Sequence, residues 1–218
     1  CVVDTIDLFS INSAMRKRLK GRFPKGRLSA ADISDAVLAE DFCNDLSVPE
    51  IGAEYEIFDR YDVAICISSH ERDLVAAKAR HPCTLYIPMA HEVIQLANSY
   101  SGPALFTAGP NPLNTQGYFY FVKKVLPHLR KQIPEFELNV TGSMCDRLAP
   151  EAGINSLGFV LDLQSLFESA KFSICPIIGK TGQQVKIVEA MANALPVVAL
   201  EAGAVGSPIQ HGVNGWIA

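Results

Sequence analysis

The sequence predicts an α/β protein with parallel β-sheets. Short apolar runs, such as 63–67, alternate along the chain with amphipathic helical segments, and β-branched residues are frequent in the runs. Strands that alternate with helices form parallel sheets joined by right-handed crossovers. Ligands of such sheets bind outside the carboxyl ends of the strands, so we expect the turns at 109–117, 142–145 and 179–183 to converge on one site.

The composition is that of an ordinary globular chain. Hydrophobic residues make up 49% of the 218 residues and charged residues 19%, which allows one large domain or two small ones. The formal net charge of −4 disfavours nucleic acid as a partner. The six cysteines form no C-x-x-C pair, and no signal peptide or membrane-length apolar run is evident, so we expect a cytoplasmic protein without a metal site.

The first half of the chain is expected to contribute three strands to a partial sheet. The strands are expected near 2–4, 63–67 and 84–87, and the helical segments at 11–20, 30–61 (interrupted near Pro49) and from Ser68 to about Arg80. Ser68 and Glu71 have the spacing of a capping box, in which each side chain bonds the other's backbone N–H at a helix start.

The second half repeats the strand–helix alternation after a turn-rich segment. Strands are expected at 104–108, 137–141, 158–160 and 172–176, and helices at 113–130 and 163–170. We therefore predict an N-terminal domain over 1–98, a linker over 99–103 and a C-terminal domain over 104–218. Both ends of the chain lie within strand-like runs, so we expect a fragment of a longer protein.

The stretch 179–200 is expected to form a glycine-containing turn, a helix of about eleven residues and a buried strand. Gln183, Lys186 and Glu189 form a stripe beside the apolar face of this helix. Backbone N–H groups of the turn, the positive helix start and Lys186 together favour phosphate. We predict a nucleotide diphosphate here, with Glu189 accepting hydrogen bonds from hydroxyl groups; an ordinary strand–turn–helix–strand unit without a ligand is the alternative.

The string K-x-x-E-A-M-A followed by P-V-V, at 186–192 and 196–198, resembles the nucleotide-sugar site of the family 4 (group 1) glycosyltransferases. Further likeness lies at 140–142, 158–163 and 211–215, whereas the N-terminal half matches loosely. The resemblance implies the GT-B fold, which has two Rossmann-like domains and an active site in the cleft between them. The first domain, which binds the acceptor, would be partial here, and the C-terminal domain, which binds the nucleotide sugar, would be truncated.

The resemblance also implies the roles of particular residues. In the family the glutamate of E-A-M-A binds the ribose of the donor, so Glu189 inherits that role. Lys186 and the backbone of Gly182 and Gln183 would stabilise the leaving diphosphate, and the side chain of Thr181 or Gln183 would touch the sugar. The predicted donor-binding residues are Gly109, Asn111, Thr181, Gly182, Gln183, Lys186 and Glu189.

The implied reaction is transfer of a hexosyl-type sugar from a nucleoside-diphosphate sugar to an acceptor hydroxyl. Retention of anomeric configuration is expected, with neither metal nor cofactor, and no catalytic residue is assigned. The acceptor would be a saccharide, a lipid-linked molecule or a small molecule, in saccharide or glycoconjugate (polysaccharide) biosynthesis.

Three departures from the family pattern leave other functions open. Ile6 stands where family members commonly have a histidine, Thr181 where many have a glutamate, and the turn at 109–117 contains no cation. A degenerate domain that binds a nucleotide sugar without turnover is therefore one alternative, and a sugar-nucleotide epimerase of the same fold is another.

Two features of the first thirty residues have competing interpretations. Asp4 and Asp7 form either an acid/base pair or a strand-end turn. The basic cluster at 16–27 is either a peripheral contact to anionic lipid at the inner face of the membrane or a solvated helix face followed by a loop.

Overall fold

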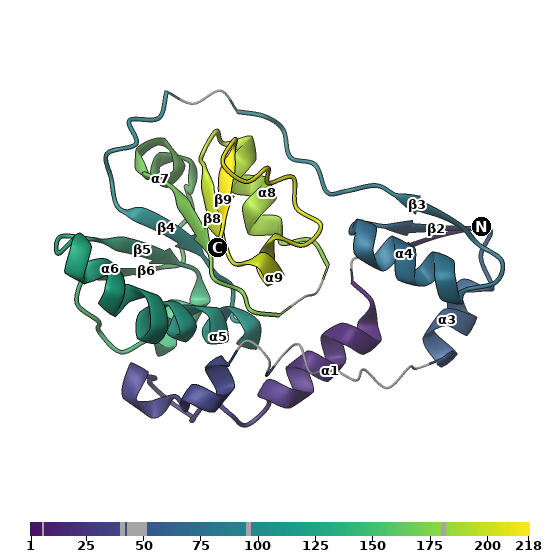
Figure 1. Cartoon of the computed structure of the whole chain (residues 1–218), viewed down its shortest axis with the longest axis horizontal. Helices are drawn as coiled ribbons and strands as arrows, with labels where there is room; N and C mark the ends of the chain where they lie inside the picture. Colours follow the sequence, from purple (N-terminus) through teal and green to yellow (C-terminus); the bar gives the residue numbers. More distant parts are fainter. Residues whose placement is uncertain (6, 40–41, 43–51, 95–96, 180–181) are drawn as a thin grey trace.

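The computed structural model describes residues 1–218 except 6, 40–41, 43–51, 95–96 and 180–181. Within the described chain, two parallel sheets carry the fold (Figure 1). The first has the order β1-β2-β3 and the second the order β6-β5-β4-β7-β8-β9. The strands are β1 (Val2–Thr5), β2 (Val63–Cys66), β3 (Cys83–Tyr86), β4 (Ala104–Thr107), β5 (Leu138–Thr141), β6 (Ile154–Gly158), β7 (Ser173–Cys175), β8 (Val197–Ala199) and β9 (Gly215–Ile217). Adjacent strands pair in parallel, which confirms the predicted α/β class.

Among the described residues of the first half, helical structure is less extensive than expected over 30–61. The helical elements are α1 (Phe9–Leu19), the 3₁₀ turns η1 (Ala30–Asp32) and η2 (Asp35–Leu38), α3 (Gly52–Phe58) and α4 (Ser69–Lys78). The predicted helical segment at 30–61 is wrong over 30–38, and 40–41 and 43–51 lie outside the described residues. Asp32 accepts the N–H of Ser29 at 2.8 Å, and Ser34 accepts the N–H of Ala36 at 3.3 Å. These local side-chain bonds cap the start of each short turn, and the residue after each turn is extended.

Helices of the second half follow the prediction more closely. They are α5 (Pro112–Tyr120), the π-helical η3 (Phe121–Val125), α6 (Leu126–Gln132), the 3₁₀ turn η4 (Ser143–Arg147), α7 (Gln164–Ser169), α8 (Val185–Ala192) and α9 (Glu201–Ala204). The π turn lies just before Pro127, whose ring removes a helical N–H. The expected strand at 158–160 is wrong: β6 ends at Gly158, which has a φ of +70°.

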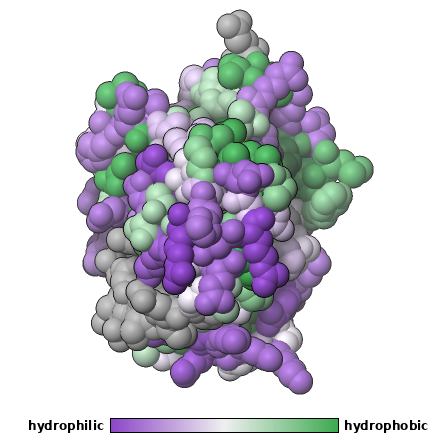
Figure 2. All heavy atoms as spheres, turned by 90° about the vertical axis from the view of Figure 1, so that its right-hand side faces the viewer, coloured by the Kyte–Doolittle hydropathy of each residue, from purple (hydrophilic) through white to green (hydrophobic). Residues whose placement is uncertain are grey.

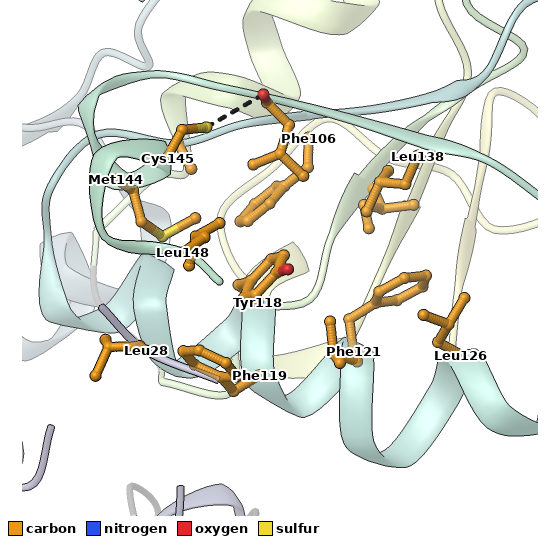
Figure 3. Close-up of a cluster of buried hydrophobic side chains, with 14 of the residues drawn as sticks. Leu28, Phe106, Tyr118, Phe119, Phe121, Leu126, Leu138, Met144, Cys145 and Leu148 are labelled. Carbon is orange, nitrogen blue, oxygen red and sulfur yellow. Dashed lines mark hydrogen bonds between the residues drawn. The ribbon is translucent and has the colours of Figure 1, made fainter. Parts of the chain in front are cut away.

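The largest apolar core lies between the second sheet and the continuous helix α5–η3–α6. Tyr118 of α5 points toward Phe106 of β4, and Phe119 and Leu28, the latter from the first half, belong to the same cluster (Figure 3). Leu28 donates its N–H to the carbonyl of Arg147 at 2.6 Å, and its carbonyl accepts from Ala149 at 2.7 Å. The segment 28–38 therefore packs on the second sheet, although it lies within the predicted first domain; the boundary at 99–103 stays a prediction.

Two further features describe the molecule as a whole. After β3 the chain runs back in extended form to β4 (Figure 1). Figure 2 shows the face on the side of the first sheet, where hydrophilic side chains predominate and smaller apolar groups lie between them. None of the helices described is long and apolar enough to cross a membrane.

Candidate functional site

A cavity of about 350 Å³ lies at the carboxyl end of β4, beside the start of α8. Its lining includes residues from the two turns at 109–117 and 179–183, so the predicted convergence of these turns is confirmed. The third turn contributes no described lining residue, so the predicted convergence is wrong for 142–145. Gly142 packs on the end of β4, where an added Cβ would meet the carbonyl oxygen of Ala108. The lining residues are Asp7, Asn12, Arg16, Thr107, Ala108, Gly109, Asn111, Leu113, Asn114, Gln183, Gln184, Val185, Lys186 and Glu189.

Lys186 is held in this cavity by neutral oxygen atoms. Its Nζ donates to Oδ1 of Asn114 at 2.9 Å and to Oε1 of Gln184 at 3.3 Å, and it lies 5.9 Å from the ring centroid of Phe106. Burial lowers the pKa of Lys186, while the nearby Glu189 carboxylate acts in the opposite direction. Since amide oxygens orient the ammonium without neutralising it, its charge remains available to an anion.

Two asparagines shape the turn after β4. Asn114 donates from Nδ2 to the carbonyl of Gly109 at 3.1 Å while accepting from Lys186, and so ties the turn to α8. Asn111 is the N-cap of α5, and its Oδ1 accepts the N–H of Leu113 at 3.0 Å. The predicted donor residue Asn111 therefore lines the cavity while its side-chain oxygen also fixes the helix start.

Glu189 lies one helical turn after Lys186 and opens onto the same cavity. Its side chain is partly buried, and among the described residues its carboxylate accepts no hydrogen bond. A carboxylate in this position can accept hydrogen bonds from the hydroxyl groups of a ligand. The geometry is consistent with the prediction made for Glu189.

The predicted roles of the turn residues before α8 need correction. The N–H of Gly182 is not free, because it donates to Oε1 of Glu71 at 3.1 Å. The side chain of Gln183 lines the cavity but is bonded at both ends: Nε2 donates to Gly206 at 3.0 Å and Oε1 accepts from Met89 at 2.9 Å. Thr181 lies outside the described residues.

Glu71 was missed as a site residue because its local pattern predicts a capping box. Ser68 is the N-cap of α4, yet its side chain makes no capping bond. The Glu71 side chain turns away from its own helix start, and its Oε1 accepts from Gly182 and, at 3.3 Å, from Leu8. The residue is 2% exposed, and burial raises the pKa of its carboxyl to about 7.

The cavity is completed by side chains that follow β1. Asp7 accepts from Nδ2 of Asn12 at 2.6 Å, and burial raises the pKa of Asp7 while the charge of Arg16 opposes this shift. Asp4 does not line this cavity; it lies in a neighbouring hollow of about 530 Å³ that also includes Asp7, Asn12 and Arg16. Asp7 thus lines both hollows, one with predicted donor residues and the other with Asp4.

Two parallel sheets with a polar cavity at their carboxyl ends define the GT-B class of α/β proteins. Solved structures support the class. Anabaena HepE in complex with UDP has a TM-score of 0.60 and 14% identity, over 100% of this chain and 64% of that one. An S. aureus TarM variant in complex with fondaparinux, α-GlcNAc-glycerol and UDP has a TM-score of 0.61 and 13% identity, over 76% of this chain and 35% of that one.

The family follows from the sequence of the second half. Residues 102–218 match the family described as glycosyl transferases group 1, so the chain belongs to this family. A similar protein from Klebsiella pneumoniae, described as an uncharacterized 44.6 kDa protein in the cps region, is 26% identical over 113 residues. That match covers 46% of this chain and 29% of the relative, so the chain spans less than a third of the relative's length.

Proposed function

We propose that the protein transfers a sugar from a nucleoside-diphosphate sugar to an acceptor hydroxyl group. The observation that carries this proposal is the placement of Lys186 and Glu189 on one face of α8, both open to a cavity at the end of β4. A cation beside a helix start suits a diphosphate, and a carboxylate one turn later suits the hydroxyls of a ribose. Complexes of TarM and HepE with UDP support a donor of this class.

Breaking the anomeric bond leaves negative charge on the diphosphate. In this proposal Lys186 stabilises that charge, and its fixed hydrogen bonds to Asn114 and Gln184 hold the ammonium in place before the reaction. We further propose a retaining mechanism that needs no metal.

For the acceptor and the cellular location of the reaction, we propose classes rather than single molecules. We propose a saccharide, lipid-linked or small-molecule acceptor, in cytoplasmic saccharide or glycoconjugate synthesis. Any membrane contact would be peripheral. The basic cluster supports such a contact only weakly, because Arg18 and Arg27 donate to the carbonyls of Phe42 and Leu148 and Arg16 lines the cavity.

The first experiment measures binding of nucleoside diphosphates to the complete protein. Wild type is expected to bind one of them, and Glu189→Ala to bind it about tenfold or more weakly, because a charge-assisted hydrogen bond to a hydroxyl is lost. Glu201→Ala, which removes an exposed carboxylate at the start of α9, is the matched control and is expected to bind like wild type. If no nucleoside diphosphate binds, or Glu189→Ala binds as well as wild type, the proposal is wrong.

A second experiment separates transfer from the alternatives. The described lining contributed by the turn at 109–117 holds no cation, which favours a degenerate domain as the second candidate. The complete protein is incubated with the sugar form of the nucleotide that binds, with and without saccharide acceptors. Release of nucleoside diphosphate with a glycosylated product supports transfer, binding without turnover supports the degenerate domain, and isomerised donor without acceptor supports the epimerase.

A further inference from the structure

The cavity has a second cation, and it comes from the first half of the chain. Among the described lining residues, Arg16 and Lys186 are the cations, and Asp7 and Glu189 are the anions. Arg16 lies on α1, whereas Lys186 lies on α8 beside the second sheet. The guanidinium is exposed, and its interaction with Asp7 is electrostatic rather than a close ion pair.

A single lysine is a weak counterion for a diphosphate here. Two charges of each sign line the cavity, so its formal charge balance is zero before a ligand enters. Lys186 is partly buried, and this burial already disfavours its charged form. A diphosphate brings at least two negative charges into this partly enclosed site, and its stable binding calls for a cation in addition to Lys186.

Arg16 is suited to that task by its chemistry and by its anchoring. A guanidinium presents donors in a planar fork that matches two phosphate oxygens and stays charged at any physiological pH. The preceding residue, Met15, is 1% exposed and packs with Leu113 and Ile178 in one buried cluster. An added Cβ at Gly179 would lie 2.1 Å from Cε of Met15, so α1 lies directly against the turn that precedes α8. This packing holds Arg16 at the rim of the donor cavity.

We propose that Arg16 is a donor-binding residue, whose guanidinium binds the diphosphate from the side of α1 while Lys186 binds it from the side of α8. The inference rests on the proposed function. The turn at 109–117 contains no cation. In this proposal the charge comes instead from Arg16 on α1, in the other half of the chain. Donor binding would then join α1 to the second sheet through the phosphate groups.

The test compares Arg16→Ala with Lys17→Ala, which removes the neighbouring exposed cation of the same helix that lines neither cavity. Calorimetry on the complete protein measures the affinity for the nucleoside diphosphate that wild type binds and for the corresponding nucleoside. Arg16→Ala is expected to lose about tenfold or more in diphosphate affinity, with nucleoside affinity unchanged. Lys17→Ala is expected to match wild type for both ligands, and Arg16→Lys to recover part of the loss as a point charge.

Each other outcome counts against a stated claim. Equal diphosphate affinity of Arg16→Ala and wild type would overturn the role of Arg16 and leave the proposed function intact. An equal loss of affinity for nucleoside and for nucleoside diphosphate would also overturn the role of Arg16, since it would indicate a structural effect. The melting temperature of the ligand-free variant checks for such an effect independently. If wild type binds no nucleoside diphosphate, the proposed function itself fails, and the inference fails with it.

Discussion

Glu71 accepts a hydrogen bond from the backbone N–H of Gly182, 111 residues later in the chain, at a distance of 3.1 Å. The same oxygen accepts from Leu8, so one carboxylate joins the chain after β1 to the turn before α8. The second oxygen of Glu71 is buried and has no hydrogen-bond partner within the described part of the chain. This carboxylate links the two halves of the molecule directly beside the proposed donor site.

The first prediction concerns the pH dependence of stability. The carboxyl of Glu71 has its pKa raised from 4.5 to about 7 by burial. An acid whose folded-state pKa is raised stabilises the fold most below its unfolded pKa, and that contribution is lost as pH rises through the folded value. The free energy of unfolding of wild type should therefore fall between about pH 4.5 and pH 7, by about 3 kcal/mol at most.

Glu71→Gln should remove this part of the pH dependence, because the amide oxygen still accepts from Gly182 and Leu8 but does not ionise. Urea unfolding at several pH values measures the pH dependence of the free energy of unfolding for both proteins. Glu56→Gln, an exposed neighbour on α3, is the control and should keep the wild-type slope. Parallel curves for wild type and Glu71→Gln would show that Glu71 does not titrate in this range.

Local pattern predicted the existence of α8 and the placement of Lys186 and Glu189 on it, but α8 has eight residues rather than about eleven, and Gln183 precedes it. The spacing of Lys186 and Glu189 places both on one helical face, whatever the rest of the chain does. Glu71 illustrates the opposite case: its sequence pattern fits a capping box, but the side chain meets partners at positions 8 and 182. Hydrogen bonds between distant segments leave no periodic signal, so they become visible only in the structure.

Arg16 could not be predicted as a site residue for a related reason. In the sequence it is one of several basic residues at 16–27, and charge alone does not distinguish them. The packing of Met15 against Leu113 and Ile178 decides which of these side chains faces the cavity. The helical segment at 30–61 failed on a local ground, because serine-centred turns at Ser29 and Ser34 compete with a regular helix.

A second prediction separates function from stability at Lys186. Lys186→Met keeps the volume of the side chain but removes the charge. Turnover of the complete protein should fall, because the leaving diphosphate loses a preorganised cation and the barrier should rise by about 2–4 kcal/mol. The free energy of unfolding should stay equal or rise, since a buried ammonium no longer needs to be desolvated. Lys131→Met, on the exposed side of α6, should change neither quantity; a Lys186→Met enzyme with full activity would refute the role.

A third prediction tests the neutrality of the lysine's partners. Asn114→Asp would place a carboxylate against Nζ of Lys186, where an amide oxygen now accepts at 2.9 Å. The pair should raise the pKa of Lys186 and compete with phosphate for its charge, so affinity for the nucleoside diphosphate should fall by about tenfold or more. Asn155→Asp, at the exposed side of β6, serves as the control in the same calorimetric titration. Unchanged affinity would mean that Lys186 does not contact the phosphates.

The fourth prediction concerns the segment that lies in the first half of the sequence but packs on the second sheet. Leu28 is 1% exposed and lies in the cluster with Phe106 and Tyr118 (Figure 3). Leu28→Ala should lower the free energy of unfolding by about 2–5 kcal/mol, through lost burial and the cavity left behind. Leu157→Ala removes a side chain that is 41% exposed on β6 and should cost clearly less, as measured by urea unfolding. Equal losses for the two variants would mean that the segment 28–38 is not part of the core beside the second sheet, because a leucine that completes the core must cost more than one at its surface.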